Sequence, residues 1–275
     1  MRRRKRRLVQ KFFADRGTHL AAMIAYFALL AFVPLTFLAL SLLSFTGQAD
    51  ESSFLVREIK QALPETPITD IVRLVRTVQD NAAALGIVGG VFLLWTALSL
   101  FSALESAFNI VYARPNRTFL HGKGLAFVLM IASLVTLFVA LFVGSFGVEA
   151  LNEWAPWFID NAYVAYALSV AVSTLGVFAF LISIYYVLTN VPLSMRDVLP
   201  GAAFATILLQ VSFQVLPLFL RYAELNPVLK AFGSPAILLV WLYVTANVIV
   251  FGAELNWWRR YGREPRDDVA AAGLA

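Results

Sequence analysis

The sequence contains no cysteine and only two histidines, His19 and His121, among its 275 residues. The lack of cysteine excludes structural disulfides, thiolate zinc sites, iron–sulfur clusters and a cysteine nucleophile. Neither histidine belongs to an HExxH pattern, the zinc-binding signature of many metalloproteases. We therefore expect no metal and no other cofactor.

Charged side chains are also scarce, at 14% of all residues, whereas soluble domains carry about 25%. Hydrophobic residues make up 60% of the chain, and the mean hydropathy is +0.76. A water-soluble core of this size cannot hide so much apolar surface. The composition predicts an all-α, polytopic integral membrane protein.

Long apolar runs give the number of spans. About 20 apolar residues at a rise of about 1.5 Å cross a hydrocarbon core of about 30 Å. The first run is too long for a signal-peptide core of about 7–15 residues, which favours an uncleaved span. Six transmembrane helices are predicted, at about 20–45, 82–111, 124–148, 162–188, 201–220 and 236–258.

These runs divide the chain into a basic N-terminal tail at 1–19, a membrane domain at 20–258 and a polar tail at 259–275. The first outer loop adds two short amphipathic helices within 50–80, one of which starts at Thr66-Pro67, a typical helix start. A solvated helical hairpin explains the same pattern equally well.

Basic residues predict the orientation. Sixteen Lys and Arg fall in the two tails and in the loops 112–123 and 189–200, against six in the alternate loops. The positive-inside rule then places both termini in the cytoplasm. The run Arg2–Arg7 beside a first span favours anionic lipid headgroups as its partner rather than nucleic acid.

Polar residues inside the spans predict an intramembrane polar cavity. In the last span Tyr243, Asn247 and Glu254 share one helix face, and in the second span several hydroxyls align beside Glu105. Ionisable groups within spans usually face the interior of a bundle. The predicted cavity residues are Ser102, Glu105, Ser106, Asn109, Gln210, Gln214, Tyr243, Asn247 and Glu254.

Two alternatives remain open for these groups. Glu254 lies near the end of its span, so it either pairs with Arg259 or Arg260 at the interface or faces a polar interior. The hydroxyl and glycine rows either line a cavity or only pack helices together, as Gly86 and Gly90 do in a GxxxG pattern.

Two prolines inside apolar runs, Pro34 and Pro217, predict helix kinks, because proline removes one helical hydrogen bond and clashes with the preceding turn.

Four segments carry a family resemblance: AAMIAYFALLAFVPL at 21–35, GIVGGVFLLW with SALESAFNIVY at 86–95 and 102–112, LTNVPLSMRDVLPGAAFA at 188–205, and FGSPAILLVWLYVTANVIVFGAELN at 232–256. The chain resembles the YihY/BrkB family of bacterial inner-membrane proteins, formerly described as ribonuclease BN. The resemblance implies six helices, cytoplasmic termini and a bacterial cytoplasmic membrane. By motif position it singles out Tyr26, Pro34, Asn109, Pro192, Gly201, Trp241, Tyr243, Gly252, Glu254 and Asn256.

Three functions follow as hypotheses. The first is a transporter or lipid translocase that uses the polar cavity and binds a lipid or small solute. The second is an envelope scaffold that binds a partner protein. The third is a ribonuclease, which we expect least, because the acids and histidines of the predicted cytoplasmic segments are scattered without metal-ligand spacing. The sequence favours a protein that is not an enzyme.

Overall fold

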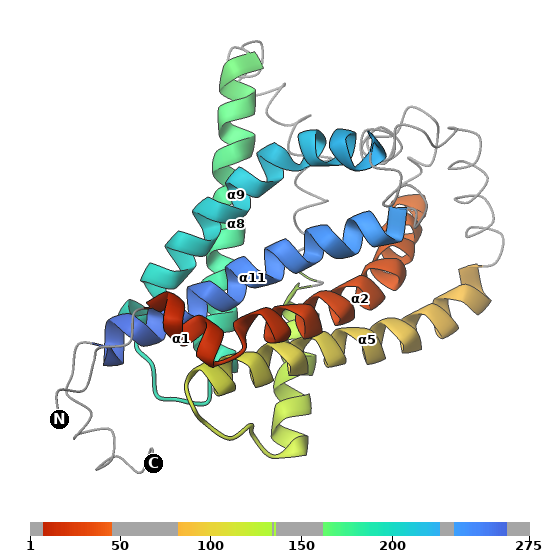
Figure 1. The fold of residues 1–275 in the computed structure, drawn as a ribbon. Helices are drawn as coiled ribbons and strands as arrows, with labels where there is room; N and C mark the ends of the chain where they lie inside the picture. Colours follow the sequence, from red (N-terminus) through yellow and green to blue (C-terminus); the bar gives the residue numbers. More distant parts are fainter. Residues whose placement is uncertain (1–7, 46–81, 134, 136–161, 226–233, 263–275) are drawn as a thin grey trace, which may run out of the picture. The chain divides into compact units, whose positions relative to one another are not determined.

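In the computed structural model the described residues are 8–45, 82–133, 135, 162–225 and 234–262, and they form seven helices without any strand. The labelled helices in Figure 1 are α1 (Leu8–Ala14), α2 (Gly17–Phe45), α5 (Ala82–Val111), α8 (Ala162–Leu188), α9 (Met195–Leu225) and α11 (Ser234–Tyr261). A further helix covers Phe119–Ser133. The all-α prediction is confirmed.

Helix length and composition support membrane crossing. Four helical segments are long and apolar enough to span a bilayer: Gly90–Val111, Val170–Leu188, Met195–Tyr222 and Pro235–Tyr261. The Gly17–Phe32 part of α2 and the helix Phe119–Ser133 are shorter apolar segments. The protein is therefore a multi-pass membrane protein, whereas the number of six spans and the domain boundaries stay predictions. The two tails beyond residues 8–262 and the predicted amphipathic helices at 50–80 lie outside the described residues.

The chain divides into two compact units, which are described separately. Unit 1 comprises Met1–Ile24, Phe101–Gln214 and Tyr243–Ala275, and unit 2 comprises Ala25–Leu100 and Val215–Leu242. In unit 2, Trp241 is buried against Phe219, with 5.8 Å between the ring centroids.

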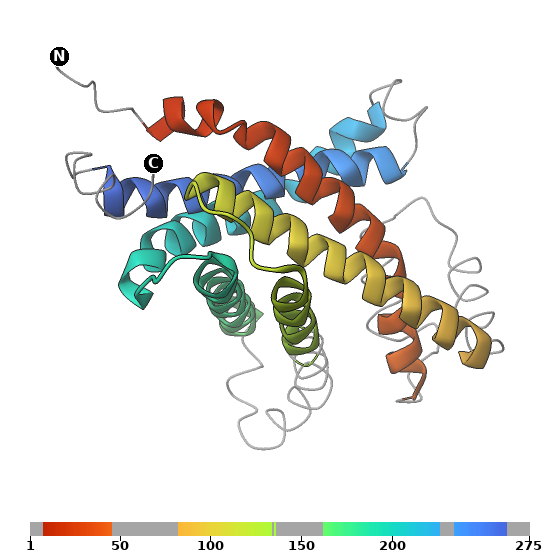
Figure 2. The same ribbon diagram turned by 90° about the horizontal axis from the view of Figure 1, so that it is seen from below.

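The first described element of unit 1 is a short helix that the sequence does not predict. Residues 8–14 form α1, and a left-handed residue, Arg16, at φ 57° separates α1 from α2. Figures 1 and 2 show α1 beside the C-terminal end of α11. The segment assigned to a basic tail is thus partly a packed helix.

Helix α9 begins at Met195, ahead of the predicted span start at residue 201. Ser194 stabilises this start, because its backbone N–H and its hydroxyl each donate to Asp197 Oδ2 at 2.8 Å. The arrangement resembles a capping box, in which an acid three residues into the helix accepts from the cap residue.

Small residues allow the closest helix approach in unit 1. A Cβ placed on Gly201 of α9 would lie 2.1 Å from the carbonyl oxygen of Gly252 in α11. The GxxxG pattern predicted such an approach elsewhere, but a Cβ on Gly90 would have nothing within 4 Å. Close backbone contact therefore occurs between α9 and α11 and not at Gly90.

The predicted kink positions lie inside two of the helices. Pro34 is within α2 and buried, and Pro217 is within α9 and exposed. Both helices continue past their proline, so a bend at either position stays a prediction.

Candidate functional site

The first element of the candidate site is Glu254, a fully buried acid near the end of α11. Its Oε2 accepts a hydrogen bond from Lys11 Nζ of α1 at 2.8 Å, with both side chains buried. In the part of the chain that the structure describes, its other oxygen, Oε1, is buried and has no hydrogen-bond partner. Isolated buried charge is costly, so the ion pair with Lys11 is what makes this position tolerable.

Lys11 is held by three further groups. Its ammonium also donates to Asp15 Oδ2 and, at 2.8 Å, to the backbone carbonyl of Val111 at the end of α5. The ammonium lies 4.1 Å from the ring centroid of Trp257, a cation–π contact. One lysine thus joins α1, α5 and α11.

The partner of Glu254 differs from the interface hypothesis. That hypothesis paired it with Arg259 or Arg260, but Arg260 forms an ion pair with Asp197 of α9. The cation that reaches Glu254 comes from the N-terminal segment, 243 positions away in sequence.

The second element is Glu105 of α5, which is also buried. Its Oε1 accepts from the backbone N–H and from the guanidinium of Arg117, both at 3.3 Å. The same guanidinium donates to three backbone carbonyls at the end of α8, those of Val187, Leu188 and Thr189, at 3.0, 2.7 and 3.2 Å. Arginine suits this place because the last carbonyls of a helix lack partners and carry partial negative charge.

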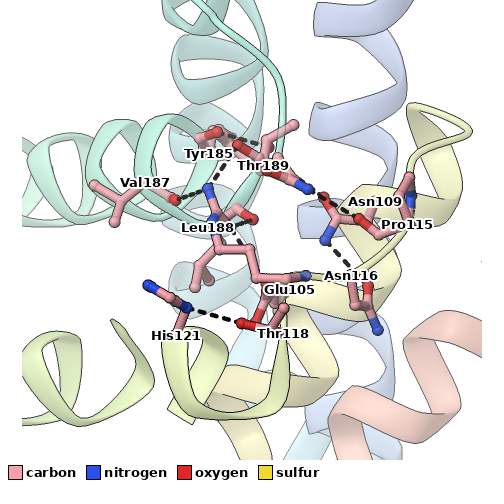
Figure 3. A network of polar contacts seen from close by, with 12 residues as sticks. Glu105, Asn109, Pro115, Asn116, Thr118, His121, Tyr185, Val187, Leu188 and Thr189 are labelled. Carbon is pink, nitrogen blue, oxygen red and sulfur yellow. Dashed lines mark hydrogen bonds and ion pairs between the residues drawn. The ribbon is translucent and has the colours of Figure 1, made fainter. Parts of the chain in front are cut away.

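Asn109, fully buried one turn after Glu105, extends this network (Figure 3). Its side-chain oxygen accepts from the backbone N–H of Asn190 at 2.8 Å, and its amide donates to Asn116 at 3.0 Å. Asn190 in turn donates to the carbonyl of Pro115 at 3.1 Å. The loops after α5 and after α8 are therefore joined by side-chain amides.

A third polar group lies where α9 and α11 touch. The backbone N–H of Gly201 donates to Asn256 Oδ1 at 2.6 Å, and the hydroxyl of Tyr185 from α8 donates to the carbonyl of Ile249 at 2.8 Å. Among the described residues, Asn256 Nδ2 and the buried hydroxyl of Thr206 have no hydrogen-bond partner. The interior of unit 1 is thus polar at several depths.

The remaining predicted cavity residues are less closely joined. Ser102 accepts from Lys123 at 3.0 Å, and Gln210 donates to Thr174 at 2.8 Å. Asn247 donates to the carbonyl of Tyr243 within its own helix, at 2.7 Å. Ser106 is half-buried and Gln214 is exposed. All nine predicted residues belong to unit 1, but a continuous cavity through them stays a prediction.

Sequence reasoning missed the cations of this site. Lys11 and Arg117 look like ordinary tail and loop charges, and only their nearness to spans that carry an acid hints at a buried role. Gly201, Gly252 and Asn256 were found through the family resemblance and not through spacing.

Tyr112 directly follows the last residue of α5, at the end of the helix that Lys11 contacts. It is buried next to Tyr261, with 6.3 Å between the ring centroids, and burial raises the pKa of its phenol far above the ordinary value. Its hydroxyl is therefore uncharged at any physiological pH.

Metal chemistry finds no support in the part of the chain that the structure describes, where no three His, Asp or Glu side chains gather to hold an ion. The acids there instead pair with Lys or Arg.

The fold and these ion pairs define a helical multi-pass membrane protein with charged groups in its interior. Residues 8–273 match the family profile described as Virulence factor BrkB, and the chain belongs to this family. This confirms the family resemblance.

Three bacterial relatives are each identical to this chain at about a quarter of the aligned residues. The putative ribonuclease-like protein YfkH of Bacillus subtilis is 26% identical, over 90% of this chain and 92% of its own length. UPF0761 membrane proteins of Azoarcus sp. and Chromohalobacter salexigens are 26% and 27% identical, over 90% and 92% of this chain. The chain spans only 61% and 62% of those two relatives. No solved structure matches the chain.

Proposed function

We propose that this protein is a transporter of the lipid-translocase type, in which the buried charged groups of unit 1 handle the polar part of the substrate. The observation that carries the proposal is Glu254: a carboxylate with no exposed surface, inside a candidate span, with one oxygen bound to Lys11 and the other without a hydrogen-bond partner among the described residues. Ionisable groups within spans mark substrate or ion pathways more often than they serve packing.

The chemistry around the acids favours a substrate with an anionic headgroup and apolar chains. Lys11, Arg117 and Lys123 present cationic groups at the ends of the spans. The outer surfaces of α8 and α9 are apolar, with Leu175 and Ile207 66% and 63% exposed. A phospholipid matches both features.

The first test is lipid flux in reconstituted vesicles. Wild-type protein is expected to make fluorescent phosphatidylglycerol in the inner leaflet accessible to dithionite, and Glu254→Gln and Glu105→Gln are expected to slow this at least tenfold. Glu264→Gln, the same chemical change in the tail that follows α11, serves as the matched control. Equal flux in vesicles with and without wild-type protein would refute the proposal.

The proposed location is the bacterial cytoplasmic membrane, with both termini in the cytoplasm. The excess of sixteen over six basic residues on the cytoplasmic side supports this orientation.

Reporter fusions test this orientation. Green fluorescent protein fused after residue 275 is expected to fluoresce, because it folds in the cytoplasm, and alkaline phosphatase inserted within 149–161 is expected to be active, because it needs the periplasm. Inactive phosphatase there together with a dark C-terminal fusion would reverse the topology.

A scaffold that binds a partner protein is the second candidate. It is favoured by the polar groups that are bound within their own helix, such as Ser183 to Ala179 and Asn247 to Tyr243. Such groups stabilise helices without lining a path. A scaffold predicts no flux in the vesicle assay.

We do not propose ribonuclease activity, although the Bacillus relative's name suggests it. Phosphodiester hydrolysis usually needs a metal or a general base beside a nucleophile. In the described part of the chain Glu105 and Glu254 are each held by a cation. Magnesium-dependent cleavage of RNA by the purified protein would contradict this view.

A further inference from the structure

Helix α1 has two different faces. Lys11 and Phe12 point into unit 1 and are only 5% and 6% exposed. Val9 and Phe13, four residues apart and thus on one side of the helix, are 53% and 62% exposed. The described part of the protein therefore leaves two large apolar side chains of this seven-residue helix mostly exposed.

The inward face fixes the direction of the outward face. The ring of Phe12 packs 5.5 Å from that of Phe251 in α11 and directly against Gly17, where a Cβ would lie 2.3 Å from the ring. Together with the Lys11–Glu254 ion pair, this contact prevents α1 from turning over. Val9 and Phe13 are thus held outward by the packing of their neighbours.

The contacts of α1 also fix its level along the membrane-spanning helices. Lys11 touches the last residue of α5, Val111, and lies over Trp257 near the end of α11. Tyr112, Trp258 and Tyr261 occupy the same end of these helices. Tyrosine and tryptophan gather where hydrocarbon meets the headgroups, so α1 lies at that level.

The charge of the residues next to α1 indicates what contacts its exposed face, the side that carries Val9 and Phe13. The six residues before α1, Arg2–Arg7, are all arginine or lysine. An interfacial helix with apolar residues on one side and basic residues beside it binds bilayers that contain anionic lipid. A protein partner would not need a position at this depth.

We propose that α1 is a membrane-contact helix, whose Val9 and Phe13 enter the headgroup–acyl boundary of a bilayer with anionic lipid while its other face binds Glu254. The same short helix then joins the lipid surface to a buried carboxylate. This holds whether the protein is a transporter or a scaffold.

Single-cysteine spin labels test the proposal directly, because the chain has no native cysteine. The variants are Val9→Cys and Phe13→Cys, with Ala14→Cys as matched control at an exposed position that lies about 100° or more around α1 from both. Each is placed in nanodiscs of phosphatidylcholine mixed with phosphatidylglycerol. Collisions with oxygen, which concentrates in lipid, are compared with collisions with a water-soluble nickel chelate.

Labels at positions 9 and 13 are expected to favour oxygen over the nickel chelate at least threefold more than the label at position 14. This contrast is expected to fall in discs of phosphatidylcholine alone. Equal ratios at all three positions would overturn the proposal. So would labels at 9 and 13 that neither reagent reaches, since protein would then cover them, and a contrast that ignores phosphatidylglycerol would overturn the role of charge.

Discussion

Gly201→Ala is expected to destabilise the protein by about 3 kcal/mol or more, because overpacking at a site that cannot yield costs this much. The added Cβ would lie 2.1 Å from the Gly252 carbonyl oxygen and 2.5 Å from Asn256 Oδ1. The first atom belongs to the backbone, and the second accepts the hydrogen bond of Gly201. Helices α9 and α11 must separate to make room. The apparent Tm in detergent, followed by tryptophan fluorescence, is expected to fall on the order of 10 °C.

Gly176→Ala in α8 and Gly90→Ala in α5 are the matched controls. Neither added Cβ would have anything within 4 Å. Alanine is the better helix former by about 0.5–1 kcal/mol, so these variants are expected to match or slightly exceed the wild-type Tm. A Gly201→Ala protein that melts with its controls would show that α9 and α11 are not in backbone contact.

Lys11→Met is expected to destabilise the protein by about 3–5 kcal/mol, the usual result of removing one partner of a buried ion pair. Methionine keeps the apolar stem but leaves the fully buried carboxyl of Glu254 without its cation. It also frees the carbonyl of Val111, which accepts from Lys11. We expect α1 to detach, which limited proteolysis of the N-terminal segment detects alongside the fall in Tm.

A double-mutant cycle separates the ion pair from packing. Lys11→Met with Glu254→Gln is expected to recover most of the lost stability, because no buried charge remains unpaired. Lys123→Met is the control, since Lys123 donates to the hydroxyl of Ser102 rather than to an acid. Its effect should stay within about 1 kcal/mol. If the double variant is no more stable than Lys11→Met alone, the charge of Glu254 does not matter.

The spans follow from the sequence because each is a local property. Some twenty apolar residues in a row predict a membrane helix whatever surrounds them, and the four helical segments that are long and apolar enough to span a bilayer fall within predicted runs or overlap them. The burial of Glu254 agrees with one of the two alternatives that the sequence left open, that its carboxylate faces the interior of the bundle and not the interface.

The partners of the acids were not predictable, because they depend on contacts between distant segments. Lys11 is 243 positions from Glu254, and it lies in a segment whose composition suggests a plain basic tail. Arg117 is only 12 positions from Glu105, but most of its hydrogen bonds go to carbonyls at the end of α8, 70 to 72 positions further on. Hydropathy describes one helix at a time and carries no information about contacts between distant segments.

Arg117 has a consequence for any movement of the protein. The planar guanidinium of Arg117 donates to the carboxylate of Glu105 and to three successive carbonyls at the end of α8 and just after it, while the backbone N–H of Arg117 donates to the same carboxylate. Sliding α8 by one turn against the end of α5 would break the three hydrogen bonds to these carbonyls at once and leave the carbonyl oxygens without their partner. Arg117 therefore joins the Phe101–Val111 part of α5, the loop that follows and the end of α8, and any shear between those two helices costs three hydrogen bonds.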